Sequence, residues 1–288
     1  MEETVRDMGQ AYAGVGSPDP RLNTHGTIDF RLTSLYQSWA KYDDPPSRVK
    51  PLPLSLLINT VRLARHESTV TAQAAADVLL IGYFFLLRPG EYLGTPNDAL
   101  GTLFRLRDLT LWVGSRALDH QACPVADLHS ATFATLTFTR HKNGVRNENV
   151  GHGRYGDPLV CPVLALASRV CALRDLYAPL STPLNAYAAT PGAPHRHVLA
   201  GNLTRRLRLA LAIHPHPAYA AKDISAHSTR AGGAMALFCA GVGAERIKLV
   251  GRWRSDELFR YLHVQTQPVM TGLSAAMLRG GSFGMAPG

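Results

Sequence analysis

The sequence predicts a mainly helical α+β domain with a small antiparallel sheet near its start. Several long segments repeat apolar residues with the period of an amphipathic or a buried helix. Residues 134–140 differ, because threonine alternates there with Ala, Leu and Phe, which is the period of a half-buried strand. Asn143 and Gly144 follow that segment and are typical of a two-residue hairpin turn. The hydrophobic fraction of 46% over 288 residues allows a sizeable core.

The N-terminal region has a different composition from the rest of the chain. Residues 1–50 are rich in Gly, Pro, Asp and Ser, and we expect one short helix there, over 30–40. Residues 43–53 are typical of a linker, because paired prolines block both a helix and a central strand.

Two helices are expected directly after the linker. The apolar pattern predicts an amphipathic helix over 54–65 and a long, largely buried helix over 71–87. The second helix should end at Leu87 or Arg88, since the Pro-Gly pair that follows disfavours its continuation.

The small sheet should follow these two helices. Strands are predicted at 106–113 and 134–140, and residues 145–150 would form the returning strand after the hairpin turn. An Ala-, Pro- and Gly-rich loop is expected over 178–198, and the tail, 279–288, has a composition typical of disorder. The remaining predicted helices cover 161–177, 202–213, 228–242, 245–251 and 256–265.

The net charge and the lengths of the apolar runs indicate which partners the protein can have. Lys and Arg outnumber Asp and Glu by 30 to 21, which gives a net charge of +9 and a pI near 9.6. This excess favours a polyanionic partner, because contacts to phosphates release condensed counterions. No uninterrupted apolar run reaches the ~18 residues that a membrane helix needs, and the N-terminus lacks the order of a signal peptide. We expect a protein without a membrane partner that stays inside the cell, in the nucleus if its source is eukaryotic.

The cysteines and histidines do not suggest a metal site. The four cysteines show neither zinc-site spacing nor a disulfide framework, so we expect reduced and mostly buried thiols. His195 with His197 and His214 with His216 lie among prolines and alanines, with no Cys or carboxylate at ligand spacing. We interpret them as histidines of surface loops and expect no metal.

Two cationic residues could each be explained by local structure. Arg88 directly follows the most apolar helix, where a cation at a helix C-terminus is favoured by the helix dipole. Lys142 lies beside the Asn143-Gly144 turn and, taken alone, is a solvated turn lysine. Neither residue by itself predicts a function.

Two further motifs have a structural interpretation and a functional one. His227 and Arg230 would lie about one turn apart on the same face of a helix that opens near His227. A plain capping segment with an exposed arginine is the weaker interpretation, because the helix dipole opposes a cation in a first turn. An anion bound at that N-terminus would relieve the conflict. Trp253 and Tyr261 could be core residues of a terminal helix with a basic outer face.

Taken together and in this order, these residues resemble the catalytic set of the tyrosine recombinase (phage integrase-like) family. The resemblance covers roughly residues 54–265 and includes Glu91, the hairpin setting of the lysine and the Gly251 turn. The phrases RHKNGVRNENVGHGRYGDPLVCPVLAL and GRWRSDELFRYL are specifically similar to recombinases of DIRS-type and Crypton-type eukaryotic mobile elements. The catalytic residues that it implies are Arg88, Lys142, His227, Arg230, Trp253 and Tyr261.

The resemblance implies site-specific DNA cleavage and rejoining through a 3′-phosphotyrosyl intermediate, without a metal or other cofactor. Tyr261 would be the nucleophile. Because the ordinary pKa of a phenol is about 10, Tyr261 is protonated at neutral pH and needs a cationic pocket and a base to lose its proton. Arg88 and Arg230 would clamp the non-bridging oxygens of the phosphate. His227 would act as the base or proton relay, and Lys142 would protonate the departing 5′ oxygen.

One catalytic position departs from the family pattern. The His or Trp of the family usually lies nine residues before the tyrosine, and this register falls on Arg252 rather than on Trp253. We favour Trp253, which would donate its indole N–H to a non-bridging oxygen, because Trp belongs to the usual pair of the family. Arg252 could instead supply this donor, so both assignments stay open.

The N-terminal region is the second departure. The family normally clamps DNA between the catalytic domain and a separate helical core-binding domain. We expect residues 1–50 to be a remnant of that domain with its linker, 51–270 to be the catalytic domain and 271–288 a flexible tail. The implied partners are double-stranded DNA and further copies of the chain, assembled as a tetramer on DNA. The alternatives are a catalytically decayed DNA-binding remnant of a mobile element and a type IB topoisomerase-like nicking and closing activity.

Overall fold

The computed structural model describes residues 2–39, 50–94, 103–138, 148–253, 258–259 and 262. The chain divides into two compact units, Met1–Arg48 and Val49–Gly288. The second unit combines helices with a small antiparallel sheet, so the expected α+β class is confirmed at this level.

The first unit contains two helices, α1 (Glu2–Gly14) and α2 (Phe30–Trp39). The sequence predicts α2 but not α1, because α1 has two glycines and few apolar residues, which leaves its helical period weak. In the loop that joins these helices, Arg21 and Asp19 form a salt bridge, with 2.5 Å from Arg21 Nη2 to Asp19 Oδ2.

The second unit begins with the two predicted helices. They are α3 (Leu54–Glu67) and α4 (Val70–Phe84). The side chain of Thr69 caps α4 by accepting a hydrogen bond at 3.2 Å from a backbone amide of its first turn. The helix α4 is buried along most of its length, as expected, but it ends at Phe84, three residues before the earlier of the two predicted ends, Leu87.

The sheet consists of four antiparallel strands in the order β2-β1-β3-β4. The two predicted strands are confirmed in their central parts, while residues 106–108 form a short 3-10 helix, η1 (Leu106–Asp108), instead of a strand. The strands are β1 (Leu109–Val113), β2 (Arg116–Ala117), β3 (Phe133–Phe138) and β4 (Glu148–Gly153).

The strands β3 and β4 pair antiparallel, as expected, although β4 overlaps the predicted returning strand only at residues 148–150. Their pairing runs from Phe133 opposite Gly153 to Phe138 opposite Glu148. Lys142 and the predicted turn belong to the connection between these strands and lie outside the described residues.

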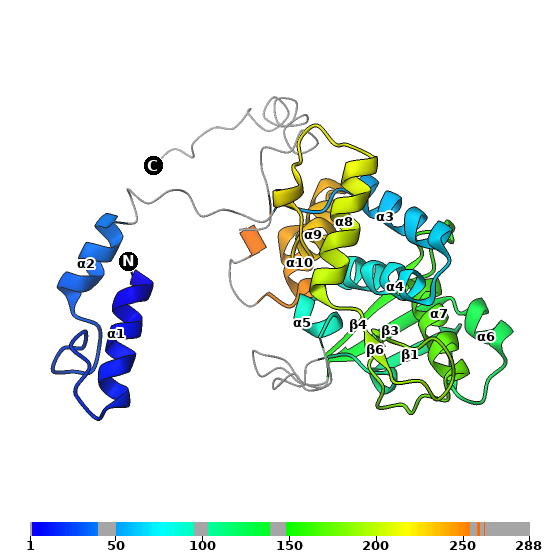
Figure 1. The fold of residues 1–288 in the computed structure, drawn as a ribbon, viewed down its shortest axis with the longest axis horizontal. Helices are drawn as coiled ribbons and strands as arrows, with labels where there is room; N and C mark the ends of the chain where they lie inside the picture. Colours follow the sequence, from blue (N-terminus) through cyan, green and yellow to red (C-terminus); the bar gives the residue numbers. More distant parts are fainter. Residues whose placement is uncertain are drawn as a thin grey trace, which may run out of the picture. The chain divides into compact units, whose positions relative to one another are not determined.

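The remaining elements complete a helical layer around α4 and the sheet (Figure 1). The sequence predicts α7 to α10, whereas α5, α6 and the β5–β6 hairpin are too short to produce a recognisable period. The predicted helix over 256–265 and the tail lie outside the described residues, apart from 258–259 and 262. These elements are α5 (Pro89–Tyr92), α6 (Val125–Ser130), α7 (Pro162–Asp175), β5 (Ala186–Tyr187), β6 (Arg196–His197), α8 (Ala200–Ile213), η2 (Ala221–Asp223), α9 (Ser228–Cys239) and α10 (Ala244–Gly251).

The helix α4 is the centre of the core, because α3, α7 and α9 all pack against it. Two glycines allow α9 to come close. A Cβ atom at Gly233 would lie 2.2 Å from the carbonyl oxygen of Tyr83, and one at Gly232 would lie 2.4 Å from that of Leu52. A side chain at either position would force the segments apart, so Gly233 sets the distance between α9 and α4, and Gly232 sets the distance between α9 and the segment that precedes α3.

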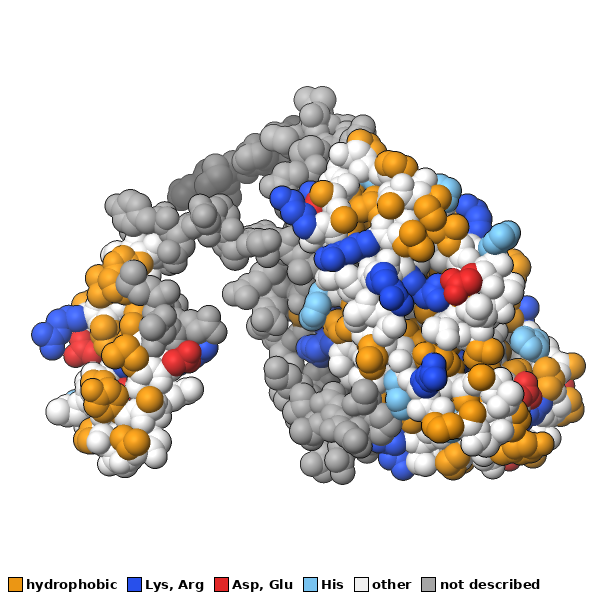
Figure 2. Space-filling view, viewed as in Figure 1, with side chains coloured by type: hydrophobic (Ala, Val, Ile, Leu, Met, Phe, Trp, Pro, Cys, Tyr) orange, Lys and Arg blue, Asp and Glu red, His pale blue; other side chains and the backbone are white. Residues whose placement is uncertain are grey.

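The surface of the second unit carries the positive charge expected from the composition. Lys and Arg side chains gather over α8 on the face in Figure 2. Within the described ranges, no helix is long and apolar enough to cross a membrane.

Candidate functional site

The C-terminal end of α4 presents main-chain carbonyl groups to two buried arginines. After α4 the chain passes through Leu86, whose φ of 49° lies in the left-handed region. The carbonyl oxygen of Leu86 accepts hydrogen bonds from Arg230 Nη1 and, at 3.3 Å, from Arg252 Nη2. Carbonyl groups at a helix end carry partial negative charge, so they stabilise cations. A left-handed leucine costs roughly 1–3 kcal/mol, and the surrounding packing and these hydrogen bonds hold it in place.

Arg88 and Glu91 form the short helix α5 beside this carbonyl cluster. Arg88 is the N-cap residue, and its backbone N–H donates to Glu91 Oε2 at 2.7 Å. Its side chain also donates from Nη1 to Glu91 Oε1 at 3.3 Å. Arg88 is 30% exposed and Glu91 7%, so a buried carboxylate holds a cation that reaches the surface. Arg88 therefore begins a new helix after α4 rather than ending the long one.

Arg252 is a buried cation that ties several elements together. Its side chain is 3% exposed and donates from Nη2 to Glu91 Oε2 at 3.1 Å. Its guanidinium carbon lies 3.7 Å from the centre of the Phe138 ring. Burial lowers the pKa of Arg252 to about 10, although the neighbouring Glu91 raises it. These contacts give Arg252 a structural role, in which it holds Glu91 and the end of β3.

Arg230 is also buried, and Trp253 covers it. Its Nη2 donates to the carbonyl oxygen of Gly251 at 2.6 Å, while its guanidinium carbon lies 3.9 Å from the centre of the Trp253 ring. Gly251 is required there, because a Cβ atom at this position would lie 1.5 Å from the Trp253 ring. The dipole of α9 destabilises the positive charge of Arg230 in its first turn, and the carbonyl oxygens at the ends of α4 and α10 compensate by accepting its hydrogen bonds.

His227 lies on the surface at the N-terminus of α9. It is the N-cap residue of that helix, as expected for a helix that opens near this position, and its side chain is exposed. Arg230, three residues further along the chain, is buried, so the two side chains differ in exposure.

The helix α8 holds the loop that leads to His227. The backbone N–H of Ala226 donates to Thr204 Oγ1 at 3.0 Å, and Arg208 Nε donates to the carbonyl oxygen of Ile224 at 3.1 Å. The exposed histidine therefore follows a loop whose backbone is fixed.

The structure brings several of the predicted site residues into one cluster, which we call the arginine cluster. It combines three guanidinium groups with one carboxylate, and this excess of positive charge would favour a bound anion. Lys142 and Tyr261 lie outside the described residues, but Leu258 and Leu262 are buried in the same apolar cluster as Leu86 and Trp253. The members of the arginine cluster are Arg88, Glu91, Arg230, Arg252 and Trp253.

Some residues that organise the site were missed in the sequence. The carbonyl groups of Phe85 and Leu86 bind arginines, yet main-chain acceptors leave no residue-type signal. Phe138 stacks on Arg252, and the sequence shows it only as an alternating residue of a strand. Thr204 caps no helix end, so nothing in its local sequence indicates its contact with the loop before His227.

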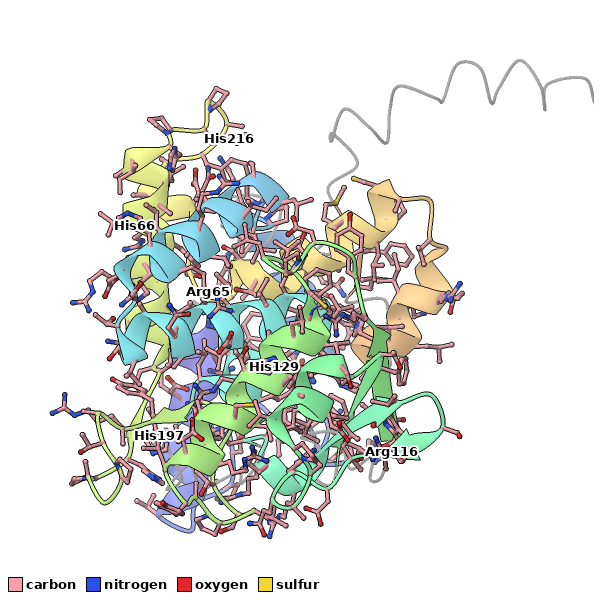
Figure 3. The ribbon with its side chains drawn as sticks, turned by 90° about the vertical axis from the view of Figure 1, so that its right-hand side faces the viewer. Arg65, His66, Arg116, His129, His197 and His216 are labelled. Carbon is pink, nitrogen blue, oxygen red and sulfur yellow. The ribbon has the colours of Figure 1, made fainter. Side chains whose placement is uncertain are left out.

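The described residues contain no cluster of His, Cys, Asp or Glu side chains that could hold a metal ion. His197 and His216 lie at opposite ends of the second unit (Figure 3). The expectation of mostly buried thiols is only partly correct, since Cys239 ends α9 at the surface. Cys161 is buried, Cys123 and Cys171 are half-buried, and Cys239 is exposed.

No protein-family profile matches the chain, and no curated protein has a significantly similar sequence.

Proposed function

We propose that this chain is a tyrosine-type DNA strand transferase, which cleaves and rejoins double-stranded DNA through a 3′-phosphotyrosyl intermediate. The observation that carries the proposal is the arginine cluster. Residues that are far apart in the sequence, from α5, α9 and the end of α10, converge there in the order that the resemblance requires. Leu262, which directly follows Tyr261 in the chain, is buried in the apolar cluster that also contains Trp253.

In this proposal the phosphate occupies the positively charged region next to Arg88, the partly exposed arginine of the cluster. The phenolic oxygen of Tyr261 attacks the phosphorus, and the bond from phosphorus to the 5′ oxygen breaks. His227 takes the proton of the phenol, and Lys142 donates one to the departing 5′ oxygen. The reverse reaction, with a 5′ hydroxyl as the nucleophile, rejoins the strand.

The buried arginines of the cluster and Trp253 have supporting roles. Arg230 supplies positive charge close to the phosphate site, and Trp253 fixes its plane by stacking. Arg252 is held by Glu91 and main-chain carbonyl groups, which favours Trp253 over Arg252 for the family's His/Trp position. We propose that the active form is a tetramer assembled on DNA.

A second candidate is a DNA-binding protein that no longer transfers strands. The observation that favours it is the engagement of Arg230, whose Nη1 and Nη2 both donate to main-chain carbonyl groups. Two of the five N–H donors of this guanidinium are thereby directed at the protein's own carbonyl groups, which leaves fewer donors for a bidentate contact to phosphate.

The test is a covalent-capture experiment with nicked duplexes of random sequence as suicide substrates. The wild-type chain should give an adduct that migrates slowly in denaturing electrophoresis, and Tyr261→Phe should give none. Tyr155→Phe is the matched control, because Tyr155 is 60% exposed and lies far along the chain from the cluster. This control should form the adduct at the wild-type level.

Other outcomes separate the alternatives. DNA binding by the wild type without any adduct would support the non-catalytic protein and overturn strand transfer. Relaxation of a supercoiled plasmid that lacks any recognition site, lost in Tyr261→Phe, would indicate a type IB topoisomerase-like activity instead.

A further inference from the structure

A cavity of about 360 Å³ lies where α9 meets the segment that leads into α3, and we call it the Tyr83 cavity. Tyr83 belongs to the C-terminal part of α4, and Tyr219, on the loop after α8, also lines the space. Apolar side chains that include Leu52, Leu54 and Met235 form most of the remaining lining, to which no charged residue that the structure describes contributes. The volume lies within the range of small-molecule sites.

Hydrogen bonds hold the segment before α3 in place on one side of this cavity. The backbone N–H of Leu52 donates to the carbonyl oxygen of Ser228, in the first turn of α9, at 2.9 Å. Tyr219 Oη donates to the carbonyl oxygen of Pro51 at 2.9 Å, which joins the loop after α8 to the same segment. The walls are thus fixed by the protein's own contacts, as in most ligand sites, which are formed before the ligand binds.

The hydroxyl of Tyr83 is a polar group without a partner in this apolar lining. Tyr83 is 4% exposed, and none of the residues that the structure describes hydrogen-bonds to its hydroxyl. The oxygen is not fully enclosed by protein, so it opens to the cavity that the side chain lines. Burial raises the pKa of Tyr83, as do the nearby Cys239 thiol and Tyr219 phenol, so the hydroxyl remains protonated at neutral pH and can donate.

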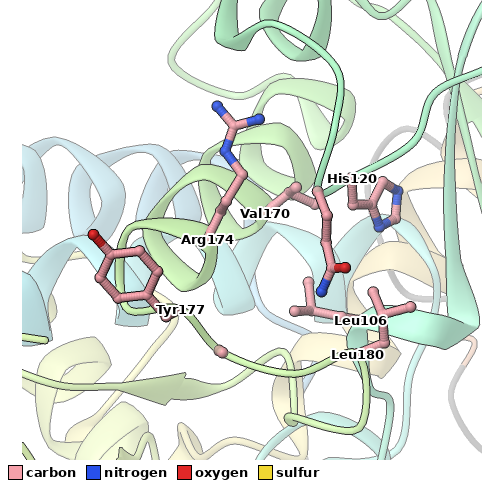
Figure 4. Close-up of a pocket in the computed structure, with 8 residues that line it drawn as sticks. Leu106, His120, Val170, Arg174, Tyr177 and Leu180 are labelled. Atoms are coloured by element: carbon pink, nitrogen blue, oxygen red, sulfur yellow. The ribbon is translucent and has the colours of Figure 1, made fainter. Parts of the chain in front are cut away.

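A second cavity of similar size, about 350 Å³, lies between η1 and the C-terminal part of α7 (Figure 4). Its cation, Arg174, donates from Nη1 to the carbonyl oxygen of Cys123 at 2.6 Å and is directed away from Leu106 and Leu180. The Nε2 atom of His120, another lining residue, lacks a hydrogen-bond partner among the described residues but is fully enclosed by protein. Neither group is open to a ligand, so this second space, the Arg174 cavity, is a suitable comparison for the first.

We propose that the Tyr83 cavity binds a small uncharged carbonyl compound. The carbonyl oxygen accepts a hydrogen bond from the hydroxyl of Tyr83, and an aromatic or branched apolar body packs against Leu52 and Met235. A buried donor without an acceptor is unfavourable, and this ligand supplies the acceptor. A charged ligand would lose its hydration without finding an opposite charge in the described lining. The site is independent of the proposed strand transfer, because the arginine cluster contributes no residue to it.

Acetophenone is a suitable probe, and α-methylstyrene and benzoate are two matches of nearly the same shape. In α-methylstyrene a methylene group replaces the carbonyl oxygen, whereas benzoate carries a negative charge. Acetophenone should raise the melting temperature of the full chain in a concentration-dependent way, because a ligand that binds only the folded state stabilises it. α-Methylstyrene should bind about three- to tenfold more weakly, since it cannot accept the hydrogen bond from Tyr83.

Alkylation of Cys239 locates the bound probe, because this exposed thiol also lines the Tyr83 cavity. Acetophenone should slow the reaction of Cys239 with iodoacetamide, as followed by mass spectrometry of peptides. At the same concentration α-methylstyrene should protect the thiol less, and benzoate should protect it least. The half-buried Cys171 is the internal control, and its alkylation should not change.

Two pairs of variants test the contacts. Tyr83→Phe removes only the hydroxyl and should make acetophenone and α-methylstyrene bind about equally, whereas Tyr155→Phe, at an exposed position, should keep the preference for acetophenone. Ala236→Trp should abolish binding by filling the Tyr83 cavity, and the fold should tolerate this change because Ala236 is exposed. Leu180→Trp, a change in the Arg174 cavity, should leave the binding of acetophenone unaltered.

The proposal is overturned if acetophenone does not bind the wild-type chain, or if α-methylstyrene binds it as tightly. An unchanged preference in folded Tyr83→Phe, or unchanged binding by folded Ala236→Trp, would also contradict it. Loss of binding in folded Leu180→Trp would place the ligand in the Arg174 cavity instead.

Discussion

Replacing Glu91 with glutamine removes the carboxylate that faces Arg252 while it keeps the shape of the side chain. Both partners are buried, with side chains that are 7% and 3% exposed, so the substitution leaves a buried guanidinium without its counter-charge. Breaking a buried ion pair from one side typically costs about 3–5 kcal/mol. The glutamine oxygen can still accept the hydrogen bond from the backbone N–H of Arg88. We therefore expect the loss in free energy of unfolding to lie near the lower end of this range, at about 3 kcal/mol.

The assay is urea unfolding at neutral pH, followed by tryptophan fluorescence. Trp253 lies in the arginine cluster and should report its loss. Glu67→Gln is the matched control, because Glu67 also pairs with an arginine, Arg206, but is 45% exposed. An exposed pair contributes about 1 kcal/mol or less, so this control should shift the unfolding midpoint only slightly.

A double-mutant cycle then isolates the pair. Arg252→Met removes the guanidinium, and the double variant Glu91→Gln with Arg252→Met should lose less stability than the sum of the two single losses. The expected coupling is about 1–3 kcal/mol, the range for residues in direct contact. The reasoning is refuted if Glu91→Gln costs no more than Glu67→Gln, or if the two single effects add.

Three further changes test other parts of the structure. Gly233→Ala should destabilise the fold by about 1–3 kcal/mol, because the new Cβ atom would clash with the carbonyl oxygen of Tyr83. Gly201→Ala is the control and should not destabilise it, because nothing lies within 4 Å of a Cβ atom at that position. Thermal unfolding of the two variants measures the difference. Burial lowers the pKa of His152 below its ordinary 6.5, so the unfolded chain gains a proton that the folded chain does not as the pH falls. The contribution of His152 to the free energy of unfolding is therefore complete above pH 6.5 and declines on acidification, by at most about 1.4 kcal/mol per pH unit. Between neutral and acidic pH, the midpoint of urea unfolding should change less in His152→Gln than in the wild type. Thr204→Val should speed hydrogen exchange at the amide of Ala226, and an unchanged exchange rate would contradict the role of Thr204 in holding the loop before His227.

The long helices and the central strands could be predicted because their apolar periods are strong. The segments 54–65, 71–87 and 134–140 all lie within or near observed elements. Short elements were missed for the opposite reason. The helix α6 and the β5–β6 hairpin contain too few residues to establish a period, and their hydrogen bonds depend on the segments around them.

The candidate site could be predicted as a set of residue types in a fixed order, but not as an arrangement. The sequence gives Arg88, Arg230 and Arg252 as similar cations. Only the packing of α9 and α10 against the end of α4 makes two of them buried, while Arg88 keeps 30% of its side chain exposed.

The sequence by itself determined the α+β class, the excess of positive charge, and the order of the residues on which the proposed function rests. The tertiary structure decided which arginines are buried, that Trp253 stacks on Arg230, and that Glu91 holds both Arg88 and Arg252. The physical reason is that periodicity and charge are local properties of the chain. The state of a buried cation depends on the carbonyl groups, carboxylates and aromatic rings that distant segments place around it.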